Sequence, residues 1–180
     1  MNSVNLYILC EGTRLDNWVD YQKVLTNSYE KKQLKNAEID TLKRFVNELL
    51  NWGIAIEDLD GFFYGFSIPQ ISKEFDLLKI FENDVVVNIE LKSNDIALDK
   101  IEYQLRKNRY YLSHLKKKIY NFTYVDSGEN GEIYSYDGDK LLKSNIEEIA
   151  QLISLKGTFV KENIERLFKA KDYLISPINT

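Results

Sequence analysis

The feature that most constrains the fold is a pair of apolar β-type segments near the middle of the chain. Residues 75–81 and 85–92 are rich in β-branched and large apolar side chains, and the turn-forming Glu82-Asn83-Asp84 separates them. A three-residue loop makes Phe81 face Val85 and fixes the register of an antiparallel hairpin. One face of this hairpin then carries an apolar set that only Lys79 interrupts: Leu77, Phe81, Val85, Val87, Ile89 and Leu91. Such a face is expected to pack on a hydrophobic core.

The same register places two acids opposite each other near the open end of the hairpin. Counting back from the loop, Asp76 pairs with Glu90, and Lys92 projects from the same face two residues later. Cβ atoms of directly opposed residues lie ~4.5–5.5 Å apart, where like charges repel. Hard carboxylate oxygens at this spacing suit Mg²⁺ or Mn²⁺. We therefore expect a divalent-metal site at Asp76 and Glu90, with the backbone carbonyl of Leu91 as a further ligand. A two- or four-residue loop would remove this geometry.

Metal-assisted phosphodiester hydrolysis is the chemistry that uses such an arrangement. A bound divalent ion lowers the pKa of its water and stabilises the charge that grows on phosphate. Lys92 is placed to orient or deprotonate the attacking water and to contact phosphate oxygens. Glu38 falls on the apolar side of a helix predicted for residues 36–52, which makes it a candidate further acid.

The remaining patterns predict an α/β fold with a mixed central sheet flanked by helices. At 180 residues the chain fits one domain. We expect its core to span about residues 36–158, with residues 159–180 forming a helix and a tail that leads to a further domain. Strands are predicted at 4–10, 62–69, 75–81, 85–92, 118–125, 133–136 and 140–142, and helices at 15–25, 36–52, 101–115, 146–155 and 161–170.

Composition excludes several classes of protein. The single cysteine, Cys10, cannot form an internal disulfide, and with the single histidine, His114, it cannot form a Cys/His zinc cluster. His114 has no G-x-S-x-G nucleophile context beside it. No run approaches the ~20 apolar residues of a membrane helix, and the first residues do not resemble a signal peptide. We expect a soluble, cytoplasmic protein without membrane partners.

The charges are unevenly distributed along the chain. The formal net charge is −4, yet residues 100–118 hold seven cations against Glu102 alone, whereas residues 126–148 hold seven acids against two lysines. A basic segment in an acidic chain indicates one localised anion-binding surface. Four residues of this segment are the expected contacts to nucleic acid: Lys100, Arg106, Asn108 and Arg109.

These motifs together resemble the PD-(D/E)XK nuclease superfamily, and more narrowly the nuclease-related (NERD-like) domains found ahead of superfamily I helicases. The stretches that carry the resemblance are Ile68-Pro69-Gln70, the Asp76 segment 73–80, the E-x-K segment 87–93, the helix segment 104–112 and, more weakly, 167–180. In relatives of the RecB type a tyrosine follows the helix glutamine by four residues; here that position is Asn108.

The resemblance carries specific implications. It implies a restriction-endonuclease-like fold, with Asp76, Glu90 and Lys92 as catalytic residues, Glu38 as the upstream helical acid and Gln104 beside the site. It further implies Mg²⁺ or Mn²⁺ as cofactor, DNA as substrate, with RNA not excluded, and a helicase or ATPase domain in the same protein.

Two other readings remain open from the sequence. Glu11 after an apolar run, followed by Asp58-Leu59-Asp60, resembles the acidic elements of Toprim domains, which are also metal-dependent. The second of these other readings is a catalytically inactive module with the nuclease fold that docks nucleic acid or protein. Divalent-ion binding at Asp76 and Glu90 distinguishes these readings, because only the nuclease site requires it there.

Overall fold

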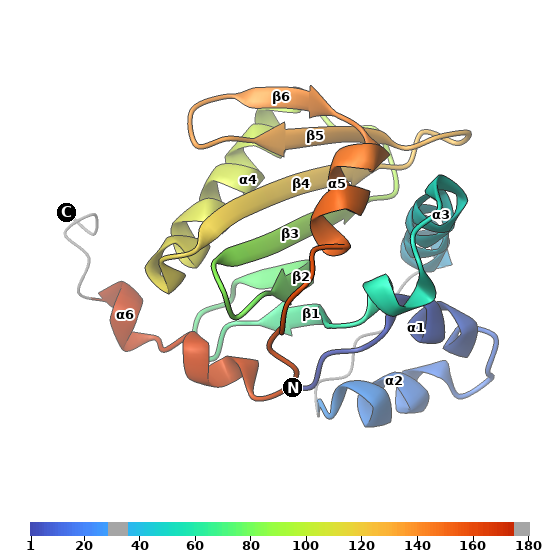
Figure 1. Ribbon diagram of the computed structural model, residues 1–180, viewed down its shortest axis with the longest axis horizontal. Helices are drawn as coiled ribbons and strands as arrows, with labels where there is room; N and C mark the ends of the chain where they lie inside the picture. Colours follow the sequence, from blue (N-terminus) through green and yellow to red (C-terminus); the bar gives the residue numbers. More distant parts are fainter. Residues whose placement is uncertain (29–35, 175–180) are drawn as a thin grey trace.

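The computed structural model describes residues 1–28 and 36–174, and it contains a six-stranded sheet whose strands follow one another in chain order (Figure 1). Only β3 and β4 are parallel; the other neighbours are antiparallel. The strands are β1 (Phe62–Ser67), β2 (Glu74–Ile80), β3 (Val85–Lys92), β4 (Lys118–Val125), β5 (Glu132–Tyr136) and β6 (Leu141–Ser144). The predicted α/β fold with a mixed central sheet is confirmed, and the narrower restriction-endonuclease-like assignment stays a prediction.

Helices cover both faces of this sheet. One face packs against α1 (Leu6–Gly12), α2 (Trp18–Thr26), α3 (Asn36–Trp52) and α5 (Ile146–Ile153), and the other against α4 (Leu98–Leu112) (Figure 1). Shorter helical turns are η1 (Ile56–Leu59), η2 (Ser113–Leu115), η3 (Ile164–Leu167) and α6 (Lys171–Leu174). Within residues 1–28 and 36–174, no helix combines the length and apolarity that crossing a membrane requires.

The central hairpin has the predicted register. The Phe81 amide donates to the Val85 carbonyl at 2.9 Å, so the loop holds three residues. Leu78 then faces Asn88 and Ile80 faces Val86. The bounds predicted for α3 and β3 are also confirmed. The short loop therefore fixes the relative position of Asp76 and Glu90.

The predicted strand over residues 4–10 is wrong, because this segment forms α1. The Asn5 side chain caps the helix by accepting hydrogen bonds from the amides of Tyr7 at 2.9 Å and Ile8 at 3.3 Å. Leu6 and Cys10, one helical turn apart, are both buried. The apolar residues thus follow helical spacing, and the hydrophobic core extends beyond the expected 36–158 into the first 28 residues.

The predicted helix over residues 161–170 is also wrong. Asn163 has a left-handed backbone with φ 54°, which stops a regular helix, and residues 161–170 hold the single turn η3. The Val160 amide donates to the Ile80 carbonyl at 2.8 Å, which ties the segment to β2. Most of the stretch 173–177 that resembles a lead into a helicase lies outside the described residues.

Lys79, the one polar residue on the otherwise apolar face of the hairpin, is only 2% exposed. Its ammonium donates to the carbonyls of Asp58 and Ile153, each at 3.2 Å. The ring of Phe159 lies 4.9 Å from the same nitrogen, and those of Phe81 and Phe62 lie at 5.1 and 5.5 Å. These contacts explain how a charged side chain is retained inside this core.

Candidate active site

A cavity of about 230 Å³ lies where the ends of β2 and β3 meet the first turns of α3. Four of the predicted site residues line it: Glu38 from α3, Asp76 from β2, and Leu91 and Lys92 from β3. Glu38 is exposed to solvent, rather than packed on the apolar stripe of its helix as expected. The structure therefore brings Glu38, Asp76 and Lys92 to one cavity from three separate elements.

Glu90 contacts Asp76 from the neighbouring strand, and it is 1% exposed. Its Oε2 is 3.4 Å from the Asp76 amide nitrogen, and the Leu91 amide donates to Asp76 Oδ2 at 2.9 Å. Side-chain bonds thus replace regular ladder pairing at this position, since the regular pairs end at Leu77 and Ile89. The two carboxyl groups meet across the hairpin, as the register predicted.

Burial and the neighbouring carboxylate change the protonation of this pair. Burial raises the pKa of Glu90 well above its ordinary value of 4.5, and the charge and hydrogen bond of Asp76 raise it further. Lys73 and Asn108 act in the opposite direction but do not offset the burial. The two groups therefore resist carrying two negative charges in the absence of a cation.

A backbone irregularity at Gly65 places Asp76 in this position. Gly65 has φ 64°, a conformation that a residue with a side chain adopts only at a cost. It lies between the β1 residues Tyr64 and Phe66, which pack into different hydrophobic clusters although regular alternation would put them on one face. Asp76 lies between Phe75 and Leu77 of β2, which are separated in the same way. Asp76 therefore occupies the point where the alternation of both strands breaks.

Several residues that line the cavity were missed by the sequence analysis: Thr41, Tyr64, Glu74 and Ser93. The pKa of the Tyr64 hydroxyl is raised, first by burial and then by the charges of Asp76 and Glu38. Tyr64 reaches the site through the pairing of β1 with β2, and the loop of residues 68–73 gives no simple signal of that register. Glu74 and Ser93 lie two residues before Asp76 and one after Lys92, so their proximity could have been inferred from the strands.

The basic helix α4 meets the expectations only in part. Lys100 and Arg106 are exposed, and the Arg106 guanidinium pairs with Glu102 at 2.9 Å. Arg109 is half-buried beside Gly138, where an added Cβ would come within 2.9 Å of its Nε. Gln104 is half-buried and is not among the residues that line the 230 Å³ cavity.

Asn108, the fourth expected contact to nucleic acid, requires a correction. Its side chain is fully buried, which is incompatible with direct contact to phosphate. Instead its Nδ2 donates to Glu90 Oε1. Asn108 follows Ile101 and Leu105 on the inner side of α4, so the helical spacing of those residues was the available signal.

The Toprim-like alternative is not supported by the fold. It requires Glu11 to follow a sheet strand, but Glu11 belongs to α1 and pairs with Arg14 at 3.4 Å. Asp60 accepts a hydrogen bond from Asn5 at 2.5 Å, and Asp58 accepts one from the Ala55 amide at 3.2 Å within η1. These acids serve local structure, and the alternative is set aside.

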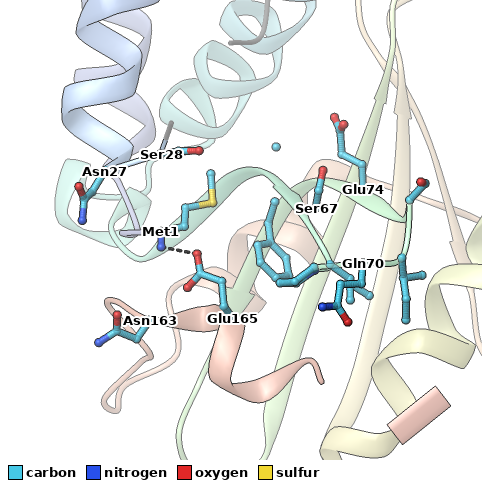
Figure 2. A pocket seen from close by; sticks show the side chains of 14 residues that line it. Met1, Asn27, Ser28, Ser67, Gln70, Glu74, Asn163 and Glu165 are labelled. Atoms are coloured by element: carbon cyan, nitrogen blue, oxygen red, sulfur yellow. Dashed lines mark hydrogen bonds and ion pairs between the residues drawn. The ribbon is translucent and has the colours of Figure 1, made fainter. Parts of the chain in front are cut away.

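A larger cavity of about 950 Å³ adjoins the site and shares Gly65 and Glu74 with it. It lies between the loop that joins β1 to β2, the end of α2 and η3. Glu165 lines it and pairs with the amino group of Met1 (Figure 2). No lysine or arginine is among the described residues that line this cavity.

The donor set fits a hard divalent cation. In residues 1–28 and 36–174, no group of three or more Asp, Glu, His or Cys side chains is arranged to hold a metal ion. The available donors are the carboxylates of Asp76 and Glu90 and the backbone of Leu91, which are oxygen ligands of the kind that Mg²⁺ and Mn²⁺ take.

Comparisons of the chain with protein-family models, curated proteins and solved structures found no match to any of them.

Proposed function

We propose that the chain carries a divalent-metal-dependent nuclease site that hydrolyses phosphodiester bonds of DNA. The observation that supports this proposal most is the meeting of Asp76 and Glu90 across the hairpin, beside a cavity that Lys92 also lines. A buried pair of like charges is costly unless a proton or a cation compensates it. A divalent cation held by two carboxylates is the compensation that also provides chemistry.

The chain's own residues have distinct tasks in this reaction. Asp76, Glu90 and the Leu91 carbonyl would hold Mg²⁺ or Mn²⁺, which when bound supplies an acidified water and charge stabilisation at phosphate. Lys92, on the cavity wall, orients the attacking water and contacts a phosphate oxygen. Glu38, which α3 contributes to the same cavity, can accept a proton or a hydrogen bond from that water.

The proposed substrate and setting follow from the charge pattern and the family resemblance. Lys100 and Arg106 are exposed on α4, as is Lys107, and they are the cations proposed to bind the phosphate backbone. By resemblance to the NERD-like group, the domain works with a helicase or ATPase domain in DNA processing or defence.

The test is cleavage of plasmid and oligonucleotide DNA with Mg²⁺ or Mn²⁺ by Lys92→Ala. The rate should fall by ~10²–10⁴-fold, the usual contribution of a positioned acid, base or charge-stabilising group. Lys143→Ala is the matched control, because this lysine is exposed on β6 and its ammonium pairs with a surface acid, Glu132, at 3.8 Å. It should cleave as the unaltered protein does.

An inactive docking module gives a different pattern. The unaltered protein would then bind DNA equally with and without the metal ion, and no condition would produce cleavage. Cleavage by Lys92→Ala at the unaltered rate would also contradict the proposal.

A further inference from the structure

The face of the sheet beneath α4 contains buried polar residues where a core would ordinarily be apolar. Asn88 and Glu90 of β3, Asn121 and Thr123 of β4, and Asn108 of α4 are each at most 1% exposed. Glu90 lies beside Thr123 and Asn88 beside Asn121 in the parallel ladder. This strip begins at the candidate site and runs beneath the helix.

Two side chains in and beside this strip converge on one oxygen of Glu90. Asn108 Nδ2 donates to Glu90 Oε1 and also to Asn88 Oδ1, the latter at 2.8 Å. Lys73 Nζ lies 4.0 Å from the same Oε1. The other oxygen, Oε2, is on the Asp76 side, 3.4 Å from the Asp76 amide. Glu90 is thus anchored through one oxygen and presents the other to Asp76.

The anchoring residues are themselves held in place. The Lys73 ammonium lies 4.8 Å from the centre of the Phe75 ring, and its side chain is 11% exposed. Asn108 contacts both Asn88 and Glu90, so its amide plane is fixed by two acceptors. Its Oδ1 is buried without a hydrogen-bond partner in the part of the chain that the structure describes. Because an unpaired buried oxygen is unfavourable for folding, stability alone does not explain this asparagine.

We propose that Asn108 and Lys73 are positioning residues, which hold Glu90 Oε1 so that Oε2 and Asp76 together form the metal site. This inference rests on the proposed function, since it assigns a role to residues behind the proposed ligands. Outer partners of metal ligands orient them, and their loss usually weakens metal affinity by about 10–100-fold.

Isothermal titration with Mn²⁺, without DNA, tests the asparagine. Asn108→Leu removes the amide while nearly keeping the side-chain volume, and Asn121→Leu is its matched control. Asn121 is an equally buried asparagine on the same face, but its Nδ2 donates to the Leu105 carbonyl at 2.8 Å rather than to Glu90. Asn108→Leu should bind Mn²⁺ about 10–100-fold more weakly, whereas Asn121→Leu should keep the unaltered affinity.

The lysine is tested by the same titration. Lys73→Met should weaken Mn²⁺ binding, and Lys73→Arg should restore most of it, because arginine can still reach Glu90 with a positive charge. Lys79→Met is the matched control, since Lys79 is a buried lysine of β2 whose ammonium contacts the carbonyls of Asp58 and Ile153 rather than Glu90. If Asn108→Leu does not fold, the Lys73 variants decide the proposal.

The possible failures are distinguishable. If the unaltered protein binds no Mn²⁺, the proposed function is overturned, and this inference with it. If Asn108→Leu and Lys73→Met both fold and bind Mn²⁺ as tightly as the unaltered protein does, the positioning role alone is overturned. An equal loss of affinity in Asn121→Leu and Lys79→Met would also overturn it, because the effect would then be a general loss of packing.

Discussion

The two faces of the central hairpin bury polar groups in different ways. On the face toward α3 and α5, the Lys79 ammonium is surrounded by backbone carbonyls and aromatic rings. On the face toward α4, buried oxygens of Asn108, Asn121 and Thr123 lack partners within the described residues. The hydrogen bonds from the Lys79 ammonium to two carbonyls are consistent with a structural role, whereas unpaired groups next to a carboxylate pair indicate a site that is not optimised for folding. We expect the first face to govern stability and the second to govern metal binding.

The largest expected effect tests the apolar face. Phe122 of β4 is 1% exposed and lies opposite Ile89 in the ladder within the larger hydrophobic cluster. Phe122→Ala should lower the free energy of unfolding by about 3–5 kcal/mol, because it removes apolar contacts and leaves a cavity. Urea denaturation measures this loss. A loss below about 1 kcal/mol would mean that this face does not dominate stability.

The next effect concerns Lys79 and pH. Burial lowers the pKa of its ammonium to about 8 from an ordinary 10.5. Between these values the folded state has released the proton and the unfolded state has kept it, so this residue makes stability rise with pH, by as much as about 3 kcal/mol. Lys79→Met should remove that rise.

The measurement is the free energy of unfolding of the unaltered protein and of Lys79→Met between about pH 8 and 10.5. In the difference between the two proteins the titration of other groups cancels. Parallel curves would contradict this expectation, because they would show that folding leaves the pKa of Lys79 unchanged.

The smallest effect tests the α4 face. Asp76→Asn removes one of two opposed charges, and its amide can still accept from the Leu91 amide and donate to Glu90. Metal-free protein should become more stable at neutral pH by less than about 1 kcal/mol, the usual scale of a cross-strand pair.

The pH dependence of this variant follows from the raised pKa of Glu90. As pH increases above 4.5, the unfolded state loses the Glu90 proton while the folded state retains it, so this group makes stability fall with rising pH until its folded pKa is passed. Asp76→Asn should weaken that fall. Thermal unfolding in chelator at several pH values measures it, and a destabilised variant at neutral pH would contradict repulsion between the two acids.

The parts of the fold that were predictable from sequence depend on local signals. The α3 bounds followed from apolar spacing that ends at Gly53, and the contact of Asp76 with Glu90 followed from a three-residue loop. Residues 4–10 misled because a short apolar run suits a strand or a buried helix equally well. The capping residue Asn5 decides in favour of the helix, and that signal was present in the sequence.

The supporting residues of the site were harder to predict because they depend on long-range packing. Asn108 faces inward on a helix whose charged residues suggest an outer surface, and only the tertiary structure shows Glu90 beneath it. Lys73 precedes β2 in an irregular loop, so no periodicity indicates where its ammonium lies. Sequence therefore predicted the meeting of Asp76 with Glu90 and the position of Lys92 beside them, but not the residues that hold Glu90.

A crystal structure of the protein soaked in Mn²⁺, with anomalous scattering recorded, tests the central claim most directly. We expect one strong anomalous peak between Asp76 and Glu90 Oε2, at roughly 2 Å from both carboxylates and from the Leu91 carbonyl. In that structure Glu90 Oε1 should still contact Asn108 and Lys73. If a crystal saturated with Mn²⁺ shows no peak at Asp76 and Glu90, or shows peaks only elsewhere on the chain, the proposed metal site is contradicted.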